Sequence, residues 1–290
     1  MKEAMLYQKL ADGKVKCGVC PHRCTIADGK RGICGVRENR QGILYALNYG
    51  KAVAVAIEPI EKKPLFHFLP RTQIYSFATV GCNLRCLWCQ NWDISQNPKP
   101  QRPIIGEDIT PEEHVKRALA AGVPSIAYTY TEPIIFVEYA LDTMKLARGK
   151  GLKNVWKTAG YMTRETLEAI TPYLDAANVD LKGPDDAFYV KYCGGEVQPV
   201  METIKYLYKA GVHIEVTTLV IPGVNDSPEQ LEKMAHFIAD EVGKDVPWHV
   251  NRFFPGWKMM DAPITSMDSL KLAEEIGKKA GLRYVHIGNV

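Results

Sequence analysis

The sequence contains no apolar run long enough to span a membrane, and residues 1–6 lack the hydrophobic stretch of a secretory signal. It shows no repeat with a period of about 20–50 residues and no low-complexity tract. The formal net charge of +3 is small, and the Lys and Arg residues are spread along the chain. These absences predict a cytoplasmic protein that binds neither membranes nor nucleic acid.

The composition is that of a protein with a large core. Its 290 residues are 46% hydrophobic and 24% charged, which fits one large α/β domain with a small addition. In a reducing compartment, clustered cysteines bind metals or act in catalysis more often than they form disulfides. Seven of the eight cysteines fall into two tight groups. Cys193 stands apart, and we interpret it as a buried free thiol outside any site.

Strand and helix patterns alternate from residue 74 to the C-terminus. Thr110 and Ser227 each precede a proline and, two residues later, a glutamate or glutamine, which is a helix start signal. Alternating strands and helices predict parallel βαβ units with right-handed crossovers, without separating a doubly wound sheet from a barrel. The predicted strands cover residues 74–80, 125–131, 154–158, 177–181, 214–221, 248–254 and 284–287.

The N-terminal part of the chain has a different character. Residues 1–40 are rich in Cys, Gly and Arg and read as loops around a metal. Residues 43–48 and 52–57 are β-branched or alternating runs, which predict a hairpin or a pair of strands. We therefore divide the chain into a Cys-rich segment with β-strands, residues 1–70, and an α/β domain, residues 71–290.

Three cysteines, Cys82, Cys86 and Cys89, follow a strand-like run and Gly81, so they lie on a loop at the C-terminal end of a strand. Three thiolates at this spacing can bind three irons of a four-iron, four-sulfur cluster. The fourth iron is then open to a substrate or cofactor. The alternatives are a structural zinc site, with His67 as the fourth ligand, or three unrelated thiols.

The spacing Cys-x3-Cys-x2-Cys, with Trp88 before the last cysteine, resembles the signature of radical S-adenosylmethionine (SAM) enzymes. Residues 61–70 and 90–96 are similar to the branch that contains pyruvate formate-lyase activating enzyme, and more narrowly to the AmmeMemoRadiSam system radical SAM enzymes. The resemblance covers nearly the whole chain. It implies a partial (β/α)6 TIM-like barrel over residues 71–290, with the cluster at the C-terminal end of the first strand.

The resemblance also implies a chemistry. The open iron would chelate the amino and carboxylate groups of SAM, and an electron from the cluster would cleave the sulfonium. The 5′-deoxyadenosyl radical so formed would abstract a hydrogen atom. The remaining strand ends should complete the site, because active sites of parallel α/β folds gather there.

By resemblance, Trp88 packs near the adenine, and Thr131 and Glu132 contact the methionine amino group, since an ammonium needs carbonyl or carboxylate acceptors. Alternatively, the residues at this second strand end cap the helix that follows. The two roles are compatible.

At the end of the third strand, Thr158 is the residue that we predict to contact SAM. Relatives carry Thr-Asn-Gly here after an acidic residue, whereas this chain has Lys157-Thr-Ala-Gly160. Because Ala159 replaces the asparagine, its polar contact should be absent here. Because Lys157 replaces the acidic residue, a monovalent-cation site built on that acid should be absent too. The Lys157 ammonium takes the place of that cation or faces outward.

Asp180 and Lys182 resemble the Asp-x-Lys motif that holds the SAM carboxylate and ribose. Strand alternation puts both on the barrel's inner face, where a charged pair needs partners. The alternative is a structural salt bridge.

Residues 220–226 resemble a loop that borders the adenosine, and His249 and Asn251 share one face of the sixth strand. We include His249 and Asn251 among the predicted SAM contacts. The alternative for His249 is a histidine that packs in the core without contacting SAM.

Cys17, Cys20, Cys24 and Cys34 form a second thiolate set at loop spacing. Four cysteines close a zinc tetrahedron and equally complete an auxiliary [4Fe–4S] cluster, and the spacing does not decide between them. His22 is a weaker candidate ligand, and disulfides come third.

We predict a radical SAM oxidoreductase that abstracts hydrogen from a protein or small molecule that the sequence does not identify. A reductant such as ferredoxin or flavodoxin would supply the electron. The alternative within this class is an activating enzyme that acts on a backbone glycine of a glycyl-radical enzyme. The non-enzymatic alternative, a zinc-stabilised binding protein, leaves the residues at the strand ends unexplained.

Overall fold

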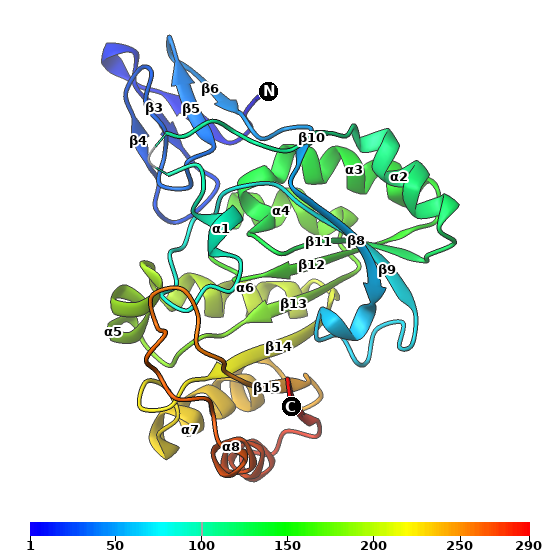
Figure 1. Cartoon of the computed structure of the whole chain (residues 1–290), viewed down its shortest axis with the longest axis vertical. Helices are drawn as coiled ribbons and strands as arrows, with labels where there is room; N and C mark the ends of the chain where they lie inside the picture. Colours follow the sequence, from blue (N-terminus) through cyan, green and yellow to red (C-terminus); the bar gives the residue numbers. More distant parts are fainter. Residues whose placement is uncertain (100) are drawn as a thin grey trace.

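A computed structural model describes residues 1–99 and 101–290. Among these residues the largest element is an eight-stranded sheet (Figure 1). All its neighbouring strands pair in parallel except the last two, which are antiparallel. Across the sheet the order is β16 (Val285–Gly288), β15 (Trp248–Arg252), β14 (His213–Val220), β13 (Ala176–Asp180), β12 (Lys153–Thr158), β11 (Ser125–Tyr128), β9 (Gln73–Ala78) and β8 (Ala54–Pro59).

Helical segments connect the parallel strands and complete a partial (β/α)6 barrel, as predicted. The predicted N-caps are confirmed: the Thr110 and Ser227 hydroxyls accept hydrogen bonds from the amides of Glu113 and Gln230 at 3.2 and 3.3 Å. The connecting segments are α1 (Trp92–Ser95), α2 (Pro111–Ala120), η3 (Pro133–Phe136), α3 (Val137–Gly149), α4 (Arg164–Ile170), η4 (Thr171–Tyr173), α5 (Asp186–Phe188), η5 (Tyr189–Cys193), α6 (Gln198–Lys209), α7 (Pro228–His236), η6 (Phe237–Val242) and α8 (Met267–Lys279).

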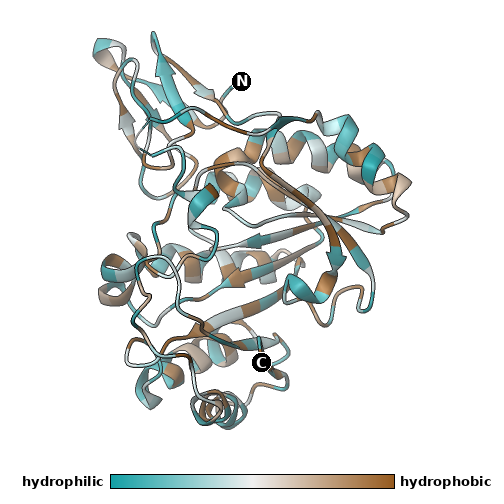
Figure 2. Cartoon of the chain, viewed as in Figure 1, coloured by the Kyte–Doolittle hydropathy of each residue, from teal (hydrophilic) through white to brown (hydrophobic). Residues whose placement is uncertain are grey.

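The main core lies between the sheet and its helices. Tyr128, Trp156 and Trp248 are fully buried there, because the strands of a parallel sheet are covered on both faces. Figure 2 shows apolar residues along the strands, while the surface of α2 is largely hydrophilic. No helix within residues 1–99 and 101–290 has the length and apolarity to cross a membrane.

The inner face of the barrel changes from apolar to polar along the strands. Near the strand starts, a buried apolar layer is formed by Ile60, Leu65, Ile74, Ala127, Val155 and Ala176. Because side chains alternate along strands, the strand register then brings polar residues together on this face. The next layer contains Lys157, Asn178 and Glu215, and the one after it Asp180, Thr217 and His249. The strand ends therefore open into a polar space.

The segment between β8 and β9, which begins with η2 (Ile60–Lys62), folds beneath that space. The amides of Phe66 and His67 donate hydrogen bonds to the buried Glu215 carboxylate at 3.0 and 2.8 Å. The Asn178 amide donates to the Pro64 carbonyl at 2.6 Å. This segment closes the barrel at the strand starts, so the cavity opens at the other end.

The first 52 residues form small sheets beside the barrel, drawn in blue in Figure 1. Residues 43–48 and 52–57 both contain strands, as predicted, but they do not form a hairpin, because the first run pairs within the N-terminal part and the second joins the barrel as β8. The sheet of the barrel thus begins at Ala54, ahead of the boundary predicted at residue 70; the division into domains stays a proposal. The small elements are β1 (Lys2–Glu3), β2 (Tyr7–Lys9), η1 (Ala11–Gly13), β3 (Val15–Cys17), β4 (Thr25–Ile26), β5 (Arg37–Arg40), β6 (Ile43–Ala46), β7 (Lys51–Ala52) and β10 (Glu107–Asp108).

Candidate functional site

The strand ends surround one cavity of about 640 Å³. All eight residues predicted to contact SAM and the three cysteines of the Cys82 loop line it, although they come from five parts of the sequence. They are Cys82, Cys86, Trp88, Cys89, Thr131, Glu132, Thr158, Asp180, Lys182, His249 and Asn251. The structure therefore brings together every residue of the predicted set.

The cysteine loop is held by its backbone. It leaves β9 at Gly81, whose φ of +104° is accessible to glycine but strained for other residues. A Cβ on Gly81 would lie 2.9 Å from the carbonyl oxygen of Cys34, so the turn also packs too closely for a side chain. The amides of Arg85 and Leu87 donate to carbonyls of η5 at 2.8 and 3.0 Å. These bonds fix the direction in which the three thiols point.

The three thiols are set up to be neutral until a metal binds. Burial raises the pKa of Cys82 and of Cys89, and a contact with the Cys193 thiol followed by burial raises the pKa of Cys86. Metal ligation requires thiolates, so binding here must release protons. Cys193 itself is fully buried, as predicted for a thiol outside the site.

The donor set fits a cluster better than a single ion. A tetrahedral zinc with bonds of about 2.3 Å to sulfur needs sulfurs roughly 3.8 Å apart. Across residues 1–99 and 101–290, no three His, Cys, Asp or Glu side chains are grouped so as to hold one metal ion. In a [4Fe–4S] cube each thiolate binds its own iron, which allows wider spacing. Three soft donors on one rigid loop at a cavity wall therefore fit the cube.

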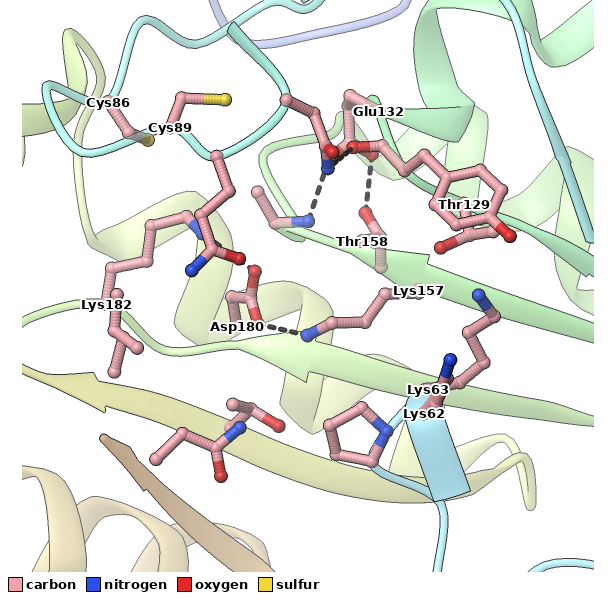
Figure 3. A pocket seen from close by; sticks show the side chains of 18 of the residues that line it. Lys62, Lys63, Cys86, Cys89, Thr129, Glu132, Lys157, Thr158, Asp180 and Lys182 are labelled. Atoms are coloured by element: carbon pink, nitrogen blue, oxygen red, sulfur yellow. Dashed lines mark hydrogen bonds and ion pairs between the residues drawn. The ribbon is translucent and has the colours of Figure 1, made fainter. Parts of the chain in front are cut away.

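Asp180 lies between two lysines on the cavity wall (Figure 3). The Lys182 ammonium is 2.7 Å from one carboxylate oxygen of Asp180, and Lys157 contacts the other. Burial opposes ionisation of Asp180, but the two ammonium groups outweigh it and lower its pKa to about 2. Lys157 therefore points into the cavity, which decides between its two predicted orientations. Two cations share one anion here, which leaves a positive charge for an anionic group.

Glu132 is a buried carboxyl at the end of β11. Its oxygens accept hydrogen bonds from the Thr158 hydroxyl at 2.5 Å and the Ala159 amide at 2.7 Å. Burial raises its pKa to about 7 in spite of these bonds. Thr158 is therefore occupied in positioning Glu132, and Thr131 donates to the Thr79 carbonyl at 2.8 Å. The carboxyl is poised to ionise when a cation enters the cavity.

Glu132 should make the stability of the ligand-free protein depend on pH. Its pKa of about 7 exceeds the ordinary 4.5, so between these values the folded chain keeps a proton that the unfolded chain releases. The free energy of unfolding should fall as pH rises through this window, by about 3 kcal/mol for this group. We expect Glu132→Gln to remove that part of the decrease. Urea unfolding of both proteins at about pH 5 and about pH 8 measures it; equal changes in both would contradict the assignment.

His249 is held in place by the buried carboxylate of Glu215. Its Nε2 lies 2.7 Å from a carboxylate oxygen of Glu215, whose other oxygen is 3.0 Å from Nε2 of His213. Burial lowers the pKa of His249, so its imidazole is neutral at physiological pH. His249 thus has the contacts of a satisfied core histidine and also lines the cavity. The Asn251 side chain also lines the cavity, close to Gly288.

The cavity residues that the sequence reasoning missed include a cluster of three polar side chains, Glu58, Lys63 and Tyr130. Glu58 accepts hydrogen bonds from the Lys63 ammonium and the Tyr130 hydroxyl, and the Lys63 ammonium lies 4.2 Å from the centre of the Tyr130 ring. All three line the cavity. Alternation along β8, which turns Ala54, Ala56 and Glu58 to one face, is the signal that could have found Glu58.

The N-terminal cysteines also converge. Cys17, Cys20, Cys24 and Cys34 line a second, small cavity of about 20 Å³. His22 lines it too, but its Nε2 lies 2.9 Å from the Asn83 carbonyl oxygen, so the ring is engaged with the Cys82 loop. The assignment of the four thiols as metal ligands stays a prediction.

A family model described as the radical SAM superfamily matches residues 77–238, more than half of the chain. The chain belongs to the radical SAM superfamily. It is therefore an enzyme of SAM-derived radical chemistry, a redox enzyme, and the family implies a [4Fe–4S] cluster with SAM as co-substrate. The prediction of a zinc-stabilised binding protein without catalysis is set aside.

Three known proteins illustrate what this radical SAM chain is similar to. It is 48% identical over 290 residues to Uncharacterized protein MJ0808 of Methanocaldococcus jannaschii, covering 100% of this chain and 86% of that protein. It is 26% identical to the pyruvate formate-lyase-activating enzyme of Clostridium pasteurianum, covering 54% of this chain and 66% of that enzyme. A radical SAM methyltransferase from Sphaerobacter thermophilus shares the fold, with a TM-score of 0.56 at 16% identity, covering 77% and 68% of the two chains. The chain is thus similar to the activating enzymes; the narrower AmmeMemoRadiSam assignment stays a prediction.

Proposed function

We propose that this radical SAM enzyme holds its cluster through Cys82, Cys86 and Cys89, binds SAM across the strand ends, and abstracts hydrogen from a protein or small-molecule substrate. The observation that carries the proposal is convergence: the cysteine loop, the buried Glu132 and the Asp180–Lys182 pair come from separate strand ends and line one cavity (Figure 3).

When bound, the cluster and SAM supply the electron and the carbon-centred radical. The protein's own residues orient SAM and neutralise its charges. Lys182 binds the carboxylate, because Asp180 leaves one of its two ammonium partners uncompensated. Glu132, held by Thr158, accepts from the methionine ammonium, which favours the ionised carboxylate. Trp88, buried against Phe188, offers an aromatic wall to the adenine, and His249 and Asn251 line the same cavity.

The substrate occupies the part of the cavity that the proposed SAM contacts leave free, bordered by Glu58, Lys63 and Tyr130. A second candidate function is activation of a glycyl-radical enzyme. It is favoured by the identity to pyruvate formate-lyase-activating enzymes, which covers about half of this chain. A flavodoxin- or ferredoxin-like reductant supplies the electron.

Anaerobic reconstitution with iron and sulfide tests the proposal. We expect a brown protein with at least four irons per chain, since one cube requires about four, which cleaves SAM to 5′-deoxyadenosine and methionine when dithionite is added. A colourless zinc protein without cleavage would contradict it. Adding a glycyl-radical enzyme as substrate, and looking for a glycyl radical by electron paramagnetic resonance (EPR), separates the second candidate from the first.

A further inference from the structure

The four N-terminal cysteines lie outside the family match, because they precede its first residue at 77. We propose that Cys17, Cys20, Cys24 and Cys34 hold a second [4Fe–4S] cluster, hydrogen-bonded by Arg37 and in electronic contact with the cluster of the cavity. The existence of the second cluster stands on its own, whereas the electronic contact rests on the proposed function.

The thiols reach one small cavity from three turns. Cys17 ends β3, Cys20 and Cys24 lie in the turn that leads to β4, and Cys34 precedes β5. All four line the same small cavity, with apolar side chains around them. Four thiolates supply one ligand to each iron of a cube, so the site needs no outside ligand. A closed ligand set of this kind transfers electrons and does not bind substrate.

Arg37 supplies the second observation. Its side chain is only 2% exposed, and its Nη2 donates to both carboxylate oxygens of Glu138, at 2.8 and 2.7 Å. Its Nε and Nη1 are buried and have no hydrogen-bond partner among the described residues. Arg37 also lines the cavity of the four cysteines. A buried cationic donor left unpaired is costly, so these N–H groups call for an anionic acceptor. The sulfurs of a cysteine-ligated cluster are such acceptors.

The spacing argues for a cluster here as well. One zinc ion would need the sulfurs roughly 3.8 Å apart. Within residues 1–99 and 101–290 no three potential ligands are grouped for one ion, although all four cysteines line the cavity. In a cube each thiolate binds a different iron, so the four sulfurs need not meet at one ion.

The second site lies directly behind the cavity's cysteine loop. The carbonyl oxygen of Cys34 is 2.9 Å from where a Cβ on Gly81 would be, and Gly81 precedes Cys82. The Lys99 ammonium donates to the Cys82 carbonyl at 2.8 Å, and His22 contacts the Asn83 carbonyl. The two cysteine sets are therefore joined by backbone in van der Waals contact. One electron given up by the reduced N-terminal cluster is taken up by the oxidised cavity cluster, and a low-potential reductant restores it.

The first test removes the cavity cluster. In the full-length chain with Cys82, Cys86 and Cys89 all replaced by alanine, anaerobic reconstitution should leave about four irons and four sulfides per chain, with an EPR signal after reduction. The matched protein with Cys17, Cys20, Cys24 and Cys34 replaced should lose the same amount of iron from the wild-type content. One zinc or no metal in the first protein would overturn the second cluster. If the second protein, which keeps Cys82, Cys86 and Cys89, binds no iron, that result would instead count against the proposed function.

Arg37 is tested in the same three-alanine background. Arg37→Met combined with Glu138→Gln removes the charged pair without leaving a buried charge alone. The two charge changes cancel, so the loss of the N–H donors alone should make the reduction potential of the remaining cluster more negative. A merely structural role would lower thermal stability and leave the potential unchanged, and that result would overturn the Arg37 assignment.

Electronic contact is tested by EPR of the fully reduced wild-type protein. Two nearby paramagnetic clusters interact, so its spectrum should differ from the sum of the spectra of the two cysteine variants. A spectrum equal to that sum would overturn the contact.

Discussion

Replacing Cys86 by alanine will abolish SAM cleavage. The cavity loop has three thiolates for three irons, and the neighbouring side chains on the loop are no substitutes, so the cube loses its anchor. The production of 5′-deoxyadenosine under dithionite should fall to the level without enzyme. Iron analysis should show the loss of about four irons, as expected for one cube.

Cys193→Ala is the matched control, because this thiol is buried beside Cys86 but is not a predicted ligand. It should keep the cluster and the cleavage activity. Cleavage that survives in Cys86→Ala would refute the ligand assignment, and equal loss in both variants would show that Cys193 is a ligand.

Removing either charge of the Asp180–Lys182 pair should weaken SAM binding about ten- to hundred-fold. Each change removes a charge-assisted contact, typically worth about 1.5–3 kcal/mol. The cluster spectrum should persist, since no cysteine is touched. Equilibrium binding of SAM to Asp180→Asn and to Lys182→Met, each with its visible spectrum, measures the two effects separately.

Lys153→Met serves as the control for Lys182→Met, because Lys153 pairs with Asp175 on the surface at the other end of β12. It should bind SAM like the wild type. Unchanged affinity in both cavity variants would make the pair a structural salt bridge. If the cluster disappears together with the affinity, β13 supports the loop and the proposed contact fails.

Much of the barrel could be predicted from local patterns. The strands predicted from residue 74 onward are confirmed, with ends that differ by a few residues, because buried parallel strands are short apolar runs between helix caps. The N-caps at Thr110 and Ser227 were equally visible, since a cap depends on residues within one turn. The pairing of residues 52–57 could not be predicted in this way. β8 pairs with β9, and β6 pairs with strands of the N-terminal part.

The sequence by itself determined the three-cysteine loop, the strand ends that follow one another around the cavity, and the four-cysteine set, because spacing and alternation are local properties. Only the tertiary structure decided which groups meet. It turned Lys157 inward onto Asp180, engaged Thr158 with Glu132, and set the unpaired N–H groups of Arg37 beside the N-terminal cysteines. These contacts join residues far apart in the chain, so they depend on the curvature and register of the barrel, which no local pattern encodes.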